Sequence, residues 1–391
     1  MPMVQDPPVE SEPVSSATLH SSDLRELVEI RPTEIFQELK RGVLGQNRAL
    51  RFVSVAIYKH ATGKVAGNLL MVGNSGTGKT TIMNNIQRLY NEVPEYRPLR
   101  AVTILNANLL VDVERMEFQP ERLLKAVEQR ARAICSEHPS PDELKEAIQR
   151  ATLCIDEIDK MSSIIAGKPN PIGVVLQQGL LTLMEGEHVA HTTYAWVDGE
   201  EKSVTLDIDT RGMMFICGGA FEGLYDQVYN RVTKPGSGEK LKTKTFRTAE
   251  GKVRQEMVFA LSDFLKPRDL FDFGMVPQFL ARFANTVLLS DLGVDVLREI
   301  LLHSFESPFR RSKRYFDVLG IELELEELAA ALIAEQAHKD TRTGARALRP
   351  IFGDLINPLE FDPEQGGHLQ RGSDGRAMLR ITADMVRQIL R

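Results

Sequence analysis

The chain has 391 residues, of which 42% are hydrophobic and 26% are charged, and its formal net charge is −6. These values are typical of a soluble protein long enough for two domains, and the acidic balance argues against general affinity for nucleic acid. The three cysteines, Cys135, Cys154 and Cys217, form no C-x-x-C pair. We therefore expect neither a zinc site nor a disulfide framework. We also expect the protein to be cytoplasmic, where thiols stay reduced. No apolar run has membrane-spanning length, which argues against a membrane segment.

Three regions follow one another along the chain. Residues 1–22 are rich in Pro, Ser and acidic residues without periodicity, which predicts a disordered tail. In residues 23–290 apolar runs alternate with helical stretches, which predicts a large α/β domain with a parallel sheet flanked by helices. Residues 291–391 predict a small, mostly helical C-terminal domain. Strands are expected at residues 68–72, 101–105, 152–155, 213–217, 286–289 and 376–381, and helices at residues 120–136, 294–305, 325–338, 345–357 and 383–390.

Two further segments depart from this alternation. Residues 185–209 contain alternating side chains around Asp198-Gly199, a pair typical of a hairpin turn. The segment from Lys234 to Lys244 is basic and rich in turn residues, and it is expected to be a loop.

Residues 73–80, GNSGTGKT, fit the phosphate-binding loop G-x-x-x-x-G-K-[ST]. The motif follows an apolar strand and opens a helical segment, which is the context that the motif requires. Backbone N–H groups of such a loop surround phosphate oxygens at a helix N-terminus. We expect Lys79 to reach the β- and γ-phosphates of ATP and the Thr80 hydroxyl to ligate Mg²⁺. The expected nucleotide contacts are Asn74, Ser75, Gly76, Thr77, Gly78, Lys79, Thr80 and Thr81.

A second motif, at residues 151–157, is an apolar strand that ends in Asp156 and Glu157. Asp156 is expected to hold Mg²⁺ through water, and Glu157 to polarise the water that attacks the γ-phosphate. Such a pattern alone is as often a solvated strand end, but beside a phosphate loop the catalytic interpretation is favoured. Arg282 and Arg346 are candidates for neutralising transition-state charge, although their spacing alone equally allows ordinary surface ion pairs.

With these motifs in place, the sequence resembles the ClpX-type AAA+ unfoldases from about residue 30 to residue 357. The resemblance implies the AAA+ P-loop NTPase fold, with a small helical domain after the large one. The matching blocks lie at residues 42–46, 55–60, 73–80, 154–160, 176–186, 215–221, 273–282 and 343–349.

The resemblance also implies roles for residues that spacing leaves open. Arg282 would be the arginine finger that reaches a neighbour's nucleotide, so the active unit would be a homo-oligomeric ring, a hexamer. Arg346 would be the sensor-2 arginine, carried by the small domain onto the same subunit's phosphates. Val43 and Leu44 would line the adenine pocket. In this family hydrolysis moves the small domain against the large one and pulls a polypeptide through the central pore.

The sequence also departs from the family pattern. The paired cysteines of the family's N-terminal zinc module are missing, and the aromatic pore loop aligns with residues 117–120, so that Phe118 supplies the aromatic side chain. A core position for Phe118 is equally expected. A hairpin at residues 193–203, with Tyr194 and Trp196, replaces the Arg-Lys-His loop, and Trp196 is expected to pack against the hairpin. The Ile/Leu-Gly-Phe tripeptide that docks ClpP is absent, and a basic segment with Lys234, Lys240, Lys242 and Lys244 takes its place, so a ClpP partnership is doubtful.

The sequence therefore predicts an ATP-driven protein remodeller that unfolds or disassembles a protein client without an obligatory peptidase. One alternative is a nucleic-acid-associated AAA+ motor or loader whose basic loop near Lys240 meets phosphates, which the net acidity disfavours. Another is a scaffold that binds ATP and scarcely hydrolyses it, which the presence of Glu157 and Arg282 disfavours. The motifs do not identify the client.

Overall fold

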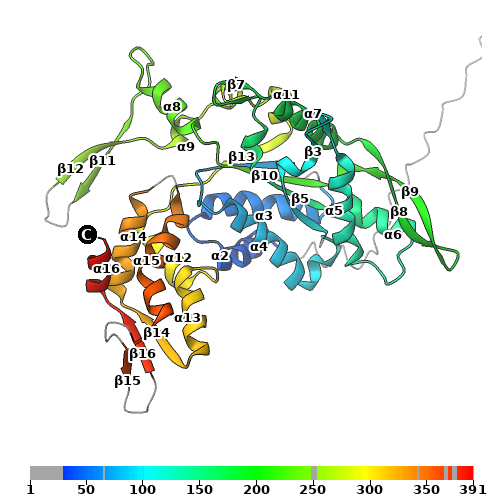
Figure 1. Cartoon of the computed structure of the whole chain (residues 1–391). Coiled ribbons are helices and arrows are strands. Elements are labelled where there is room, and N and C mark those ends of the chain that lie inside the picture. Colours follow the sequence, from blue (N-terminus) through cyan, green and yellow to red (C-terminus); the bar gives the residue numbers. More distant parts are fainter. Residues whose placement is uncertain are drawn as a thin grey trace, which may run out of the picture.

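The structure is a computed structural model that describes residues 30–64, 67–99, 101–247, 253–340, 343–364, 369–371 and 377–390 (Figure 1). The tail predicted at residues 1–22 lies outside the described residues. Figure 1 shows the chain beyond residue 291, coloured yellow to red, as a separate body beside the rest. No helix in the described part of the chain combines the length and the apolar character needed to cross a bilayer.

A five-stranded parallel sheet forms the centre of the large domain, in the order β13-β1-β10-β5-β2. Its strands are β1 (Asn68–Val72), β2 (Val102–Asn106), β5 (Thr152–Asp156), β10 (Met214–Gly219) and β13 (Phe283–Leu288). The predicted α/β fold is confirmed, and four of the five strands lie within two residues of their predicted bounds. β13 begins three residues earlier than predicted, because its burial alternates and a search for a continuous apolar run misses its exposed residues.

Helices cover both faces of this sheet. Leu69 and Met71 of β1 point to one face and Leu70 and Val72 to the other, because successive side chains of a strand alternate. On the first face lie α2 (Pro32–Gly42), α3 (Asn47–Ala61) and α4 (Lys79–Glu92). On the second face lie α5 (Pro120–Arg132), α6 (Pro141–Gln149), α7 (Pro171–Glu185) and α8 (Leu224–Thr233). Shorter helices follow, α9 (Leu261–Phe264), α10 (Pro267–Asp272) and α11 (Pro277–Leu280).

The C-terminal region has its own hydrophobic core, which extends from Leu292 to Val386. Its helices are α12 (Val294–His303), α13 (Pro308–Val318), α14 (Glu327–His338), α15 (Leu348–Phe361) and α16 (Ala383–Ile389). They pack with a three-stranded sheet of β14 (Ile321–Leu325), β16 (Ala377–Ile381) and β15 (Leu369–Arg371), in that order. The strand predicted at residues 376–381 is confirmed as β16, whereas β14 and β15 were not predicted. β14 reads Ile-Glu-Leu-Glu-Leu, with Ile321 and Leu323 buried and Glu322 exposed, and this alternation is too short to stand out in the sequence.

Two antiparallel hairpins project from the large domain on opposite sides (Figure 1). The first, β8 (His188–Val197) with β9 (Glu200–Asp209), turns at Asp198-Gly199, where both residues have positive φ, and this confirms the predicted turn. Trp196 stacks on His138, in the segment between α5 and α6, with 4.0 Å between ring centroids, so its ring packs against the body of the large domain and not against the hairpin itself. The second, which we call the arm, pairs β11 (Lys242–Arg247) with β12 (Val253–Val258). The predicted loop thus ends in a strand at Lys242.

Candidate nucleotide-binding and hydrolysis site

The phosphate loop connects the end of β1 to the start of α4, as the motif requires. Lys79 is 7% exposed, and its ammonium donates to the carbonyl oxygens of Gly73 at 2.6 Å and Asn74 at 2.8 Å. Burial lowers the pKa of Lys79 to about 8, although the carboxylates of Asp156 and Asp159 act in the opposite direction. The loop therefore holds one buried, partly desolvated cation, which suits it to a polyanion.

Thr80 and Asp156 meet beside this lysine. The Thr80 hydroxyl donates to Oδ2 of Asp156 at 2.5 Å, which brings the first turn of α4 to the carboxyl end of β5. Both side chains offer oxygen atoms, the donors that Mg²⁺ prefers, and Mg²⁺ keeps several waters besides its protein ligands. The two residues thus fit the magnesium ion that the sequence predicts.

Glu157 follows β5 in a left-handed conformation, with φ 57° and ψ 36°. Such a backbone is sparsely populated for a non-glycine residue and is common at functional sites. Its carboxylate accepts a hydrogen bond from the Asn106 side chain and lies 3.4 Å from the Lys160 ammonium. The Asn106 hydrogen bond is the main reason that the pKa of Glu157 lies below its ordinary value.

Sequence reasoning missed Asn106. This residue ends β2 and lies opposite Asp156 in the parallel register, so its amide reaches the residue that follows. A polar side chain at the carboxyl end of a neighbouring strand could have indicated it, but the predicted strand stopped one residue earlier, at Leu105. Asp159 was also missed. Its carboxylate accepts from the backbone N–H of Ala220 at 3.1 Å, and burial raises its pKa.

The small domain contacts the phosphate loop directly. Arg346 donates to the Ser75 hydroxyl at 2.7 Å, and the backbone N–H of Ala345 donates to the Gly76 carbonyl at 3.2 Å. Gly76 has φ +70°, and a Cβ there would lie 2.1 Å from the carbonyl oxygen of Thr343. Only glycine allows both this backbone conformation and this close approach. The structure thus brings Arg346 to the loop on which the sequence expects it.

Arg282 lies at the opposite end of β1. Its carbonyl accepts from the Asn68 side chain at 3.1 Å, and its guanidinium pairs with Glu185 at the end of α7. Asn68 opens β1 and the phosphate loop follows Val72, so the five residues of β1, about 16 Å of strand, separate Arg282 from its own loop. Among the predicted site residues, Arg282 is therefore not brought to the nucleotide site of its own subunit.

Val43 and Leu44 precede a buried amide that fixes their segment to the loop. Val43 is buried and Leu44 is half-buried. Two residues later, Gln46 donates to the carbonyl of Thr77 at 3.0 Å. A Cβ at Gly45 would lie 2.6 Å from Val296, so this segment also faces the small domain. The position suits a base-binding pocket between the domains.

Phe118 lies in β4 (Glu117–Phe118), which pairs with β3 (Val111–Asp112). Its ring is half-buried and covers Gly179 of α7, where a Cβ would lie only 2.1 Å from Cγ of Phe118. In the turn between β3 and β4, Val113 is 61% exposed and Met116 is 38% exposed with φ +55°. The loop therefore presents Val113 and Met116 to solvent, and Phe118 to the protein interior.

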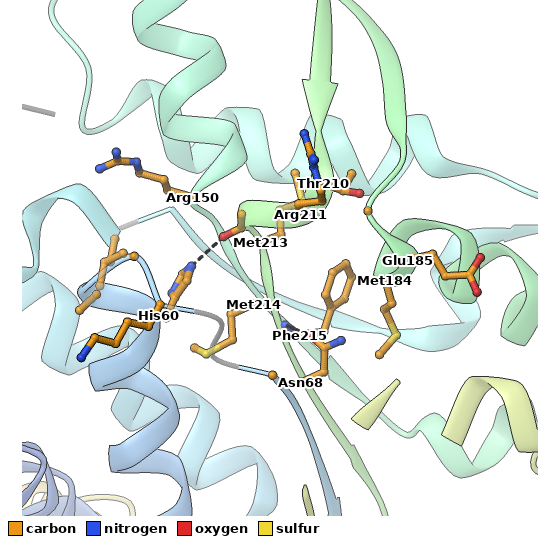
Figure 2. Close-up of a pocket in the computed structure, with 17 residues that line it drawn as sticks. His60, Asn68, Arg150, Met184, Glu185, Thr210, Arg211, Met213, Met214 and Phe215 are labelled. Atoms are coloured by element: carbon orange, nitrogen blue, oxygen red, sulfur yellow. Dashed lines mark hydrogen bonds between the residues drawn. The ribbon is translucent and has the colours of Figure 1, made fainter. Parts of the chain in front are cut away.

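A cavity of about 470 Å³ lies where β1 and β10 begin, at the end of the sheet away from the phosphate loop. Figure 2 shows Glu185, Arg150, Arg211 and His60 around it. Burial lowers the pKa of His60 to about 4, so the imidazole is neutral at pH 7, and its Nε2 lies 3.0 Å from the Gly212 carbonyl oxygen. This cavity carries none of the phosphate-binding features, but Glu185 joins it to Arg282.

Comparison with known proteins agrees with this geometry. The family model of the AAA domain (Cdc48 subfamily) matches residues 64–286, more than half of the chain. The protein named ATP-dependent Clp protease ATP-binding subunit ClpX from Bacteroides thetaiotaomicron is 28% identical over 378 residues, covering 92% of this chain and 82% of that protein. The protein of the same name from Bacteroides fragilis is 28% identical over 350 residues, covering 85% of this chain and 77% of that protein. The chain belongs to the AAA domain family (Cdc48 subfamily), and it is a ClpX-like AAA+ ATPase.

Proposed function

We propose that this chain forms a hexameric ring that uses ATP hydrolysis to unfold or disassemble a protein client, with no obligatory ClpP partner. One observation carries the ring: Arg282 and the phosphate loop of the same subunit lie at opposite ends of β1. A head-to-tail interface between identical subunits forms a ring when its rotation closes, and it would bring Arg282 of one subunit to the loop of the next. Its pairing with Glu185 on an accessible surface leaves the side chain available for such an interface.

The site residues divide the chemistry of hydrolysis among themselves. The backbone N–H groups of residues 74–81 and the Lys79 ammonium would bind the phosphates. Thr80 and Asp156 would hold Mg²⁺, which neutralises charge on the phosphate oxygens when bound. The pKa of Glu157 lies below its ordinary value, so the carboxylate is ionised at neutral pH and would orient the attacking water as a hydrogen-bond acceptor. Arg346 already touches the loop and would stabilise charge that develops on the phosphates.

Client binding would use the loop between β3 and β4. We assign the client contacts to Val113 and Met116, whose exposed apolar side chains suit an unfolded polypeptide, and we assign to Phe118 the support of this loop from inside. The domains would be residues 23–290 and 291–391, since the third hydrophobic core begins at Leu292. The free cysteines fit the cytoplasmic setting that we propose.

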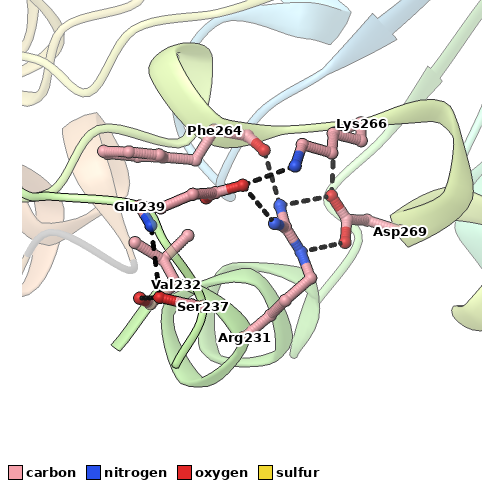
Figure 3. Close-up of polar contacts among 7 residues, drawn as sticks. All are labelled: Arg231, Val232, Ser237, Glu239, Phe264, Lys266 and Asp269. Atoms are coloured by element: carbon pink, nitrogen blue, oxygen red, sulfur yellow. Dashed lines mark hydrogen bonds and ion pairs between the residues drawn. The ribbon is translucent and has the colours of Figure 1, made fainter. Parts of the chain in front are cut away.

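The arm follows the basic segment that stands in place of the ClpP-docking tripeptide, and charged side chains anchor it to the large domain. It starts from a cluster of charges in which Asp269, 2% exposed, accepts two hydrogen bonds from Arg231, at 2.7 and 3.0 Å (Figure 3). Glu239 pairs with both Arg231 and Lys266, which ties the start of the arm to α10. Exposed Lys234 and Lys240 lie before the arm, and they favour the second candidate, a nucleic-acid-associated motor. Acidic partners for Lys242 and Lys266 weaken that alternative.

The decisive experiment mixes two inactive variants. Glu157→Gln should bind ATP without hydrolysing it, and Arg282→Ala should leave each site without its finger. In a 1:1 mixture about a quarter of the interfaces combine an intact Glu157 with a neighbour's intact Arg282, so ATPase activity should reappear. Glu201→Gln, on the exposed strand β9, is the matched control and should be fully active. No activity in the mixture would refute the shared site.

Two further measurements separate the alternatives. Lys79→Ala should abolish ATP binding, and unchanged affinity would refute the phosphate-loop assignment. Binding to DNA or RNA that falls steeply with salt would favour the nucleic-acid motor, whereas ATP-dependent unfolding of a client trapped by Glu157→Gln supports the remodeller. Added ClpP should neither bind nor change the ATPase rate, and a stable complex would contradict that part of the proposal.

A further inference from the structure

The linker between β13 and α12 is tied to the phosphate loop by two side-chain bridges. One is the amide of Gln46, which joins Thr77 of the loop to Ser290 of the linker. The other is a hydrogen bond from the Asn74 side chain to Asp291, at 2.9 Å. The phosphate loop and the linker are separated by more than 200 positions in the sequence, so they are joined only in the folded protein.

The Gln46 bridge is buried and fully paired. Gln46 is 3% exposed, and its Nε2 donates to the carbonyls of Thr77 at 3.0 Å and Ser290 at 2.8 Å. Its Oε1 accepts from the backbone N–H of Ser290 at 3.1 Å. Breaking either side would leave a buried polar group without its partner, which costs about 1–3 kcal/mol. Gln46 therefore holds loop and linker together as a fixed point.

The Asn74–Asp291 bridge differs because it is exposed to solvent. The Asn74 carbonyl also accepts from the Lys79 ammonium, so Asn74 is held by the residue that is expected to bind phosphate. On the other side, the Leu292 carbonyl lies 3.0 Å from Nδ1 of His338 in α14. Lys79, Asn74, Asp291, Leu292 and His338 thus form a continuous path from the phosphate loop to the small domain.

We propose that Asn74 and Asp291 are positioning residues that make the orientation of the small domain depend on the state of the phosphate loop. This inference rests on the proposed function of the loop as the nucleotide site. When the Lys79 ammonium moves from the Asn74 carbonyl to a phosphate, Asn74 is released on one side and carries Asp291 with it. Gln46 keeps Ser290 in place, so the displacement becomes a rotation of the linker about that point.

The test compares Asn74→Ala, Asp291→Ala and the double variant with Asp291→Asn, which retains an acceptor oxygen. Asp295→Ala, four residues further in the exposed first turn of α12, is the matched control. Two quantities are measured: the dissociation constant for a fluorescent ADP analogue, and the distance distribution between spin labels at exposed positions 88 and 318 in the nucleotide-free protein. Labelled subunits are diluted with unlabelled ones, so that only distances within one subunit are recorded.

Each single alanine variant should change the dissociation constant by about threefold to tenfold, the value of one exchanged hydrogen bond, and should broaden the distance distribution. The double variant should be no worse than either single one, and Asp291→Asn should resemble the wild type. Additive effects, or an unchanged distance distribution, would overturn the inference. If Lys79→Ala abolishes nucleotide binding while the effects of Asn74→Ala and Asp291→Ala are additive, only this inference fails. If the Lys79→Ala protein binds nucleotide normally, the proposed function fails.

Discussion

Replacing Gly179 with alanine tests whether Phe118 supports its loop from the interior. Gly179 lies inside α7, where alanine is favoured over glycine by about 1 kcal/mol. The added Cβ would lie 2.1, 2.4 and 2.6 Å from the Cγ, Cδ1 and Cβ atoms of Phe118. The ring cannot simply turn away, because Phe118 is paired with Val111 in the β3–β4 ladder. Such overpacking costs about 1–3 kcal/mol, so Gly179→Ala should destabilise the large domain by about 1 kcal/mol in net.

The same substitution should have the opposite sign when the ring is removed. In a Phe118→Gly background all three of these atoms are absent, so Gly179→Ala should stabilise the domain by about 0.5–1 kcal/mol through helix propensity alone. Urea unfolding followed by tryptophan fluorescence suits the measurement, since the chain has one tryptophan, Trp196, and it lies in the large domain. Gly353→Ala is the control, because a Cβ in α15 meets nothing closer than 3.8 Å and lies in the other domain.

A Gly179→Ala effect that is stabilising in both backgrounds would refute the packing of Phe118 on α7. That result would instead favour Phe118 as the residue that contacts the client in the pore. The assignment of client contacts to Val113 and Met116 would lose its basis. If the sign reverses as expected, Val113→Ser and Met116→Ser should weaken client binding more than Phe118→Leu does.

Three other predictions concern charged groups. Because the pKa of Lys79 is about 8, binding of ATP at pH 8.5 should take up about 0.7 proton, measured by calorimetry in buffers of different ionisation enthalpy, and Lys79→Arg should remove this uptake. Burial raises the pKa of Glu128, but hydrogen bonds from Thr193, His191 and Arg132 outweigh it and lower the pKa below its ordinary value. The stability that Glu128 contributes is thus complete above the unfolded pKa of about 4.5, and it is lost as the pH falls through the lower folded pKa. Trp196 fluorescence should therefore report loosening of the β8–β9 hairpin in that acidic range. In Glu128→Gln the same loosening should be seen already at pH 7. Asp269→Asn should destabilise the start of the arm by about 2 kcal/mol and increase its proteolysis, while faster cleavage of the β8–β9 hairpin as well would indicate general unfolding instead.

The site residues that could be predicted from the sequence are those that form a motif of neighbouring residues. The phosphate loop and the Asp156-Glu157 pair each combine a strand, a few consecutive residues and a turn or helix, so spacing alone predicts their geometry. Asn106 and Gln46 escaped because their partners are 51 and up to 244 residues away, and no local pattern records such a contact. β14 was missed for a related reason, since the strand that pairs with it, β16, lies far away in the sequence.

Gly76 takes part in the contact between the domains in a way that the phosphate-loop motif alone does not predict. The motif accounts for this glycine through the phosphates, which need a loop with positive φ. The fold uses the same residue a second time, since the missing Cβ admits the Thr343 carbonyl and lets Ala345 and Arg346 contact the loop. A side chain at position 76 would therefore disturb both the phosphate loop and the contact that the small domain makes with it. Because one residue serves both surfaces, we expect a shift of the loop to displace the small domain as well, and this contact would act together with the Asn74–Asp291 bridge in the coupling that we propose.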